Sequence, residues 1–154
     1  MTAYRISEDE FLFLSVRTGL SHLPGWCKKD TIQQNTDKIT DSLLAKDFLI
    51  DSSERTAILH PAIAYMFSIM KNASVWCGFG DRAFLYFHEK RYILLERECT
   101  ERLRMVPMEN AAACFTWLEE NEYFSECQIL YDDKTERAAG EAAELKSRME
   151  VYLE

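Results

Sequence analysis

Few residues of this sequence stand at the spacings that catalysis or metal binding requires. The three histidines, His22, His60 and His88, lie far apart, and none has a cysteine or carboxylate at the spacing of a metal-ligand pair. The chain contains no G-x-S-x-G, G-x-G-x-x-G, G-x-x-x-x-G-K-[S/T] or H-E-x-x-H motif. Gly78-Phe79-Gly80 is too short to cradle a phosphate and indicates a turn. We therefore expect no catalytic residue, no metal and no cofactor, and predict that the protein is not an enzyme.

Two acidic pairs and five cysteines are the other groups that could carry chemistry. Glu119-Glu120 and Asp132-Asp133 are sequence neighbours, so their side chains diverge and do not converge as a catalytic acid and base must. The cysteine count is odd and no C-x-x-C pair occurs, which argues against zinc and redox pairs. Cys77 and Cys114 stand in apolar context and are predicted to be core residues. Free thiols of this kind are typical of the reducing cytoplasm, where we expect the protein to act.

The charge of the chain is strongly asymmetric. Residues 1–104 hold 14 basic and 14 acidic side chains, whereas residues 105–154 hold 4 basic and 12 acidic ones. No basic patch is visible, which argues against binding to nucleic acid or to anionic lipid. No apolar run approaches the roughly 20 residues of a membrane span, and the first residues are too acidic for a signal peptide. The acidic end is either a solvated surface or a docking surface for a basic partner.

The first half of the chain predicts helices and a hairpin. Ser7 with Glu10 three residues later has the spacing of a capping box, and Gly19 suits the end of that helix. A second helix is expected over about 31–46, a small hairpin within 48–59, and a third helix from Pro61 to Asn72. This order resembles a winged helix.

From residue 73 the hydrophobic period changes from helical to two. Four short segments with short separators predict an antiparallel meander that Pro107 ends. A helix is expected over 108–121, a short strand over 128–131 and a final helix over 136–153. The predicted fold is α+β, with winged-helix-like helices followed by an antiparallel β-meander and C-terminal helices. We expect one domain over 1–154, with a helical part (1–72), a sheet with a helix (73–131) and an acidic C-terminal helix (132–154).

The two middle strands are apolar on both sides. A sheet packed on one side only should alternate apolar and polar residues, and the segments 82–88 and 91–97 do not. Either helices of the same chain cover both faces, or a second molecule covers one face or an edge. Under the second interpretation, the predicted partner-binding residues are Trp76, Phe84, Tyr86, Tyr92 and Leu94.

DNA binding is the alternative function, because a winged helix often places a helix in the major groove. The helix over 31–46 offers Gln33, Gln34 and Asn35 for base edges, and Lys38 with Arg55 of the hairpin for phosphates. Few cations are present to hold the phosphates, which weighs against this alternative.

The order of motifs resembles the N-terminal half of the EspG-type chaperones of type VII (ESX) secretion. The matching segments are G-L-x-x-L-P from Gly19, L-x-x-K-D-F-L-I-D from Leu43, HPAIAYMFSIMKNA from His60 and RAFLYFHEKRYILLERE from Arg82, so the resemblance covers about 6–121. Within them, the positions that match the family pattern are Leu20, Leu23 and Pro24, Leu49 to Asp51, and Arg82 to Leu85.

Members of that family are about twice as long and contain two similar halves. The resemblance implies that a homodimer supplies the missing half by twofold symmetry. It also implies a non-enzymatic cytosolic chaperone or adaptor that binds helical secretion substrates as clients. It carries over no substrate-contact residue, because no motif in this chain fixes one.

Overall fold

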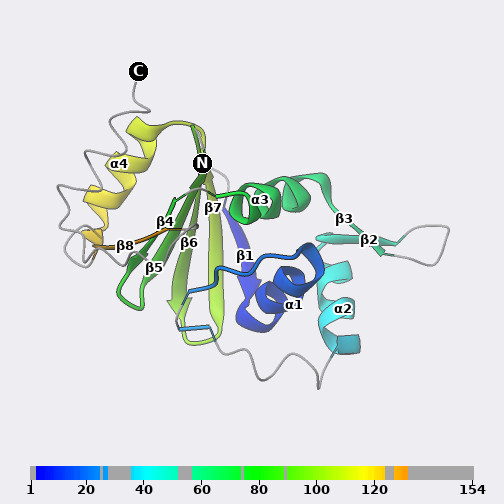
Figure 1. The fold of residues 1–154 in the computed structure, drawn as a ribbon. Coiled ribbons are helices and arrows are strands. Elements are labelled where there is room, and N and C mark those ends of the chain that lie inside the picture. The colour runs from blue at the N-terminus through cyan, green and yellow to red at the C-terminus, as the bar shows by residue number, and fades with distance from the viewer. Residues whose placement is uncertain are drawn as a thin grey trace.

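The computed structural model describes residues 3–24, 26–27, 36–51, 57–73, 75–88, 90–123 and 127–131. Six antiparallel strands form the central sheet in the order β1-β7-β6-β5-β4-β8 (Figure 1). Their bounds are β1 Tyr4–Ser7, β4 Val75–Phe79, β5 Ala83–His88, β6 Arg91–Cys99, β7 Arg102–Met108 and β8 Cys127–Tyr131. The predicted α+β class and the antiparallel meander are confirmed.

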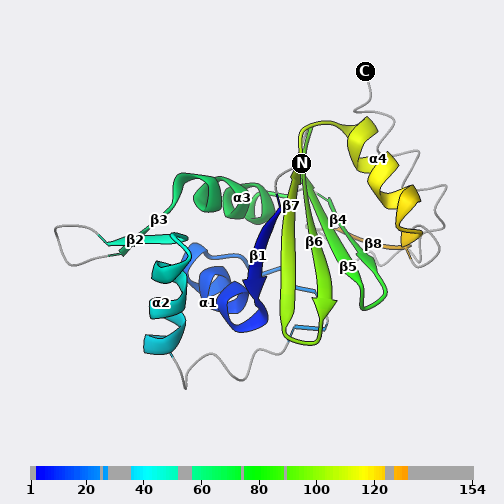
Figure 2. The same ribbon diagram turned by 180° about the vertical axis from the view of Figure 1, so that it is seen from behind.

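Helices lie on both sides of this sheet. The helices α1 (Glu8–Thr18), α2 (Thr36–Ala45) and α3 (Pro61–Lys71) lie on one side, and α4 (Ala111–Glu120) lies on the other (Figures 1 and 2). A separate hairpin of β2 (Leu49–Asp51) and β3 (Ala57–Leu59) projects from the outer end of the three-helix side. The molecule therefore has three layers, with the sheet in the middle.

Local signals set the helix ends where the sequence predicts them. The Ser7 hydroxyl accepts from the Glu10 N–H at 3.1 Å, and the Glu10 carboxylate accepts from the Ser7 N–H at 2.8 Å. Gly19 ends α1 with a φ of +82°, in the left-handed region that glycine adopts without strain. His60 caps α3 by accepting the Ala62 N–H on Nδ1 at 3.1 Å, and Pro61 follows it in the first turn.

The structure adds one strand that the sequence pattern does not predict and changes the end of another. Before the first helix, β1 pairs with β7 and places Tyr4 opposite Met105. Pro107 was expected to end the meander, but it lies inside β7 opposite Ile93. A proline is tolerated there because β1 stops at Tyr4, so no described strand pairs with β7 beside Pro107. The predicted short strand is confirmed as β8, which pairs with β4 at the far edge.

The doubly apolar strands are explained by helices of the chain itself. Ile93 and Leu95 of β6 pack with α1, α2 and α3, whereas their neighbours Tyr92 and Leu94 pack with α4. Successive side chains of a strand point to opposite faces, so each face receives its own apolar core. The interpretation that a second molecule must cover one sheet face is therefore wrong for the middle strands.

Some predictions fall on residues outside the described ranges. They include the first turns of the helix expected from residue 31, the hairpin turn at 52–56, and the acidic helix expected within 132–154. In the part of the chain that the structure does describe, no helix is both long enough and apolar enough to cross a membrane.

Candidate functional site

The five predicted partner-binding residues are all buried in the single chain. Trp76, Phe84 and Tyr86 belong to the core under α1, α2 and α3, and Tyr92 and Leu94 belong to the core under α4. The structure therefore divides them between the two faces of the sheet and leaves none of them as a surface for a client. The sequence could not show this, because coverage of a face depends on where distant helices pack.

Contacts around Tyr86 show how complete this burial is. The Tyr86 hydroxyl donates to the backbone carbonyl of His22 at 2.7 Å, and the His22 ring stacks on Trp76 with centroids 4.3 Å apart. Burial raises the pKa of Tyr86 well above its ordinary value. These aromatic residues fasten the connector after α1 to the sheet, which is a structural role.

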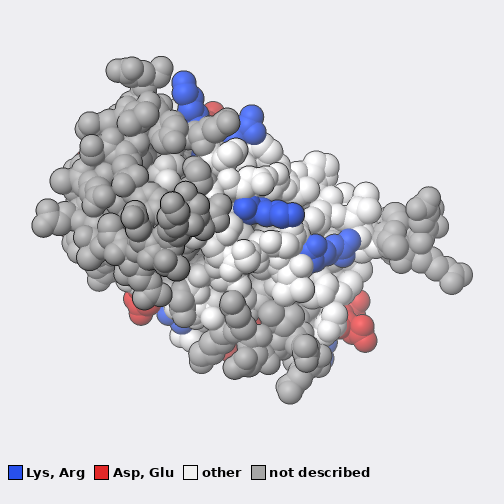
Figure 3. Space-filling model, in the orientation of Figure 1, with Lys and Arg blue, Asp and Glu red and all other residues white. Residues whose placement is uncertain are grey.

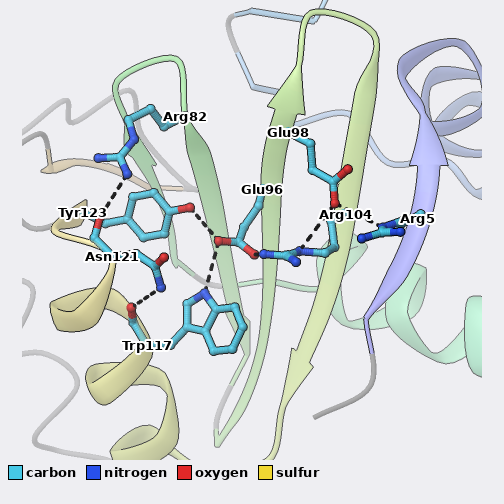
Figure 4. A network of polar contacts seen from close by, with 8 residues as sticks. All are labelled: Arg5, Arg82, Glu96, Glu98, Arg104, Trp117, Asn121 and Tyr123. Atoms are coloured by element: carbon cyan, nitrogen blue, oxygen red, sulfur yellow. Dashed lines mark hydrogen bonds and ion pairs between the residues drawn. The ribbon is translucent and has the colours of Figure 1, made fainter.

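A buried carboxylate forms the densest polar network of the described chain (Figure 4). Glu96 of β6 is 4% exposed and accepts hydrogen bonds from Arg104 Nη2 at 2.7 Å and Arg104 Nε at 3.1 Å. Its other oxygen accepts from the indole N–H of Trp117 at 3.1 Å and the hydroxyl of Tyr123 at 2.5 Å. Glu98 extends the network on the sheet through an ion pair with Arg5 at 3.2 Å.

This network anchors α4 and does not present a reactive group. Both oxygens of Glu96 already accept hydrogen bonds, and the hydrogen bond to Glu96 raises the pKa of Arg104. Burial, with the hydrogen bond to Glu96, raises the pKa of Tyr123 far above neutrality, so its hydroxyl stays a donor. The sequence pattern does not reveal this network. Its only signal is an acid that directly follows the apolar run of residues 92–95 within a strand.

A second buried carboxylate joins two helices on the opposite side of the sheet. Besides capping α1, Glu10 accepts from Lys46 Nζ at 2.6 Å and from the Ser42 hydroxyl at 2.9 Å; Ser42 lies in α2 and Lys46 directly follows that helix. Burial alone raises the pKa of Glu10, but the hydrogen bonds from Lys46, the Ser7 backbone and Ser42 outweigh it and lower the pKa. Glu10 therefore positions α2 against α1.

A groove of about 590 Å³ opens between α3 and the end of the sheet where β6 begins and β7 ends. This volume lies in the range of ligand pockets. Most of its walls are apolar, and three charged or amide side chains stand at it: Arg91, Glu109 and Asn110. The Asn110 side-chain oxygen is already in use, because it accepts the Ala113 N–H at 2.8 Å as the cap of α4. Sequence reasoning gave no sign of this groove, since five separate segments line it.

Two exposed apolar side chains form a pair on the projecting hairpin. Among the described residues, four large apolar side chains are exposed: Val16, Ile50, Ile58 and Tyr65. Ile50 and Ile58 face each other across β2 and β3 and are 39% and 52% exposed. Val16 lies in the last turns of α1, where the neighbouring Arg17 donates to the Ala57 carbonyl of the hairpin.

The residues predicted for DNA contact are only partly described. Lys38 is exposed on α2, whereas Gln33, Gln34, Asn35 and Arg55 lie outside the described ranges. In the view of Figure 3, the described basic side chains form separate spots on a largely uncharged surface. This face of the described surface offers no continuous basic patch to a phosphate backbone.

Histidine and cysteine are the residue types that most often bind zinc. Within the described ranges, no group of three or more His, Cys, Asp or Glu side chains is placed to hold a metal ion. Cys77 and Cys114 are buried, which confirms their core assignment, and burial raises the pKa of Cys114 to about 12. Of the two acidic pairs, Glu119 and Glu120 are exposed on α4, and Asp132-Asp133 lies outside the described ranges.

No protein-family model matches this chain, and a search of curated proteins finds no similar sequence. What the chain binds is therefore inferred from its own surface and from the resemblance of its motifs.

Proposed function

We propose that this protein is a non-enzymatic, cytosolic protein-binding module that serves as a chaperone or adaptor for helical client proteins of a type VII secretion system. The client class comes from the resemblance to the EspG-type chaperones. The apolar face of the projecting hairpin supports protein binding, and it replaces the sheet faces as the contact surface.

One side of the hairpin packs on the core and the other exposes apolar side chains, which favours a protein partner. Leu49 and Leu59 on one side pack against the core, while Ile50 and Ile58 on the other side face the solvent as a cross-strand pair. Exposed apolar side chains that gather on a projecting element are typical of interaction sites. A helical client could cover this pair with its own apolar stripe.

The same observation weighs against the winged-helix regulator. A wing that holds DNA needs cations for the phosphates. Here the described outward face of the hairpin carries two isoleucines, and the described hairpin residues include no Lys or Arg.

A homodimer is part of the proposal, as the resemblance implies. By twofold symmetry, a second copy would supply the half that this chain lacks relative to members of that family. Sedimentation of the purified chain is then expected to show a dimer, and a monomer at high concentration would remove this part of the proposal without touching client binding.

Co-purification with a candidate client tests the function. The probe is a small helical WxG-type protein, the client class that the proposal names, and it is expressed together with this chain. The double variant Ile50→Thr/Ile58→Thr keeps β-branched side chains but removes the apolar face, and we expect it to retain at least tenfold less client. The variants Ile50→Val/Ile58→Val and Tyr65→Thr are the controls, because the first stays apolar and the second changes an exposed apolar residue elsewhere.

Two results would contradict the proposal. One is equal retention of the client by the threonine pair and the wild type. The other is retardation of random duplex DNA at low salt that falls steeply as salt is added, which would favour the winged-helix regulator.

A further inference from the structure

Two opposite charges stand at the mouth of the groove beside α3 without forming an ion pair. Tyr92 of β6 pairs with Met108 of β7 at the end of their ladder, and Arg91 and Glu109 are the adjoining residues just beyond this pair. Both side chains are exposed and both line the groove. Among the described residues neither has an ion-pair partner within 4 Å. The Arg91 guanidinium lies instead over the ring of Tyr65, 5.6 Å from its centroid.

The groove behind these charges is apolar. Alternation along the strands places Ile93 and Pro107 on the same face as Arg91, where Met66 and Ile69 of α3 form the opposite wall. The short side chain of Ala62 on α3 leaves space between these walls. A ligand that fits must therefore combine an apolar body with a head that satisfies a cation and an anion together.

We propose that this groove binds the zwitterion of a large apolar α-amino acid. The ligand carboxylate accepts hydrogen bonds from Arg91, its ammonium group donates to Glu109, and its side chain fills the space between α3 and the sheet. Charge-assisted hydrogen bonds of this kind are the strong ones, and an arginine can hold a carboxylate through two of them.

Ligands with a single charge fit this mouth less well. A fatty carboxylate would be attracted by Arg91 but repelled by Glu109, and an apolar amine would meet the reverse. A zwitterionic head group gives both Arg91 and Glu109 an oppositely charged partner. This site is separate from the hairpin, so the inference does not rest on the proposed function.

Calorimetric titration of the full chain with three probes tests the proposal. L-Phenylalanine carries both charges, 3-phenylpropanoate lacks the ammonium group, and phenethylamine lacks the carboxylate. We expect phenylalanine to bind at least tenfold more tightly than either analogue, and glycine to bind more weakly than phenylalanine because it lacks the apolar body. Absence of phenylalanine binding at millimolar concentration, or equal binding of an analogue, would overturn the assignment.

Charge variants assign each end of the ligand. The Arg91→Gln variant should bind phenylalanine only as tightly as the wild type binds phenethylamine. The Glu109→Gln variant should bind phenylalanine only as tightly as the wild type binds 3-phenylpropanoate. Lys90→Gln is the matched control, because Lys90 is an exposed neighbouring cation outside the groove lining. An effect of Lys90→Gln as large as that of Arg91→Gln would show general electrostatic attraction and contradict the specific site.

A filling variant tests the apolar part. Ala62→Phe adds a ring at the half-buried groove wall and should abolish binding, while Ala112→Phe at an exposed position of α4 should leave it unchanged. The variant Ile50→Thr/Ile58→Thr should bind phenylalanine as the wild type does. Unchanged phenylalanine affinity in a folded Ala62→Phe protein would place the ligand elsewhere and refute the proposal.

Discussion

Three helices and more than a dozen apolar side chains close one face of the central sheet, whereas among the described residues α4 is the one helix that packs on the apolar core of the other face. Each side also holds a buried glutamate that accepts several hydrogen bonds. Glu10 joins α1 to α2 within the three-helix layer, and Glu96 joins β6 directly to α4 and to Tyr123. The difference shows that the three-helix layer is held on the sheet mainly by apolar packing. The attachment of α4 to the sheet is stabilised in addition by the buried carboxylate of Glu96.

The largest effect is expected from a truncation in the three-helix layer. Phe67 of α3 is fully buried and packs its ring on Phe11 of α1 with centroids 5.7 Å apart. Phe67→Ala should lower the free energy of unfolding by about 3–5 kcal/mol, measured by urea denaturation. Tyr65→Ala on the exposed side of the same helix should cost less than about 1 kcal/mol. Equal costs would show that α3 is not packed on the sheet as described.

An intermediate effect is expected at the anchor of the single helix. Glu96→Gln keeps the side-chain shape but removes the charge that pairs with Arg104, and it brings an amide donor towards two other donors. We expect a loss of about 2–3 kcal/mol in unfolding free energy, because Arg104 is partly exposed and is not left fully buried and unpaired. Glu98→Gln, a change at a more exposed carboxylate of the same strand, should cost less than about 1 kcal/mol. A smaller loss at Glu96 than at Glu98 would contradict the anchor.

The smallest of the three effects concerns Glu10 and depends on pH. Its pKa is lower in the folded than in the unfolded chain, so the ionised carboxylate stabilises the fold above its unfolded pKa of about 4.3. This contribution is lost as the pH falls through the folded pKa. Glu10→Gln should therefore cost about 1–2 kcal/mol at pH 7 and make the unfolding free energy less dependent on pH below about 4.3. If the unfolding free energy of the variant falls with decreasing pH as steeply as that of the wild type, Glu10 is not the group that causes the loss of stability in acid.

Features that depend on local residue chemistry could be predicted from the sequence, whereas features that depend on packing between distant segments could not. Helix ends depend on residues that are close together in the sequence, so the sequence alone predicts them. The examples are the capping box of Ser7 and Glu10, the C-terminal Gly19, and His60 before Pro61. The strand β1 was missed because it is only four residues long and is held by pairing with residues 102–105, almost a hundred positions away. Its existence depends on a partner that no local pattern reveals.

The candidate site was the least predictable part for the same reason. Apolar residues on both sides of β5 and β6 fit a covered core and a client surface equally well, and only the positions of α3 and α4 decide between them. Arg91 and Glu109 come to one groove because they adjoin the last residue pair of the β6–β7 ladder, and the groove itself needs α3 beside the sheet. The exposed face of Ile50 and Ile58 likewise appears only once the hairpin has one side packed.

Thiol labelling of the native full-length chain tests most directly whether the chain's own helices close both sheet faces. Cys77 and Cys114 lie in the core under α4, whereas Cys99 is exposed at the end of β6. With mass-spectrometric mapping, the account predicts that Cys99 reacts quickly, while Cys77 and Cys114 react only as fast as the protein unfolds. Labelling of Cys77 and Cys114 at the rate of Cys99 under native conditions would show that α4 does not cover the sheet, and would contradict the account.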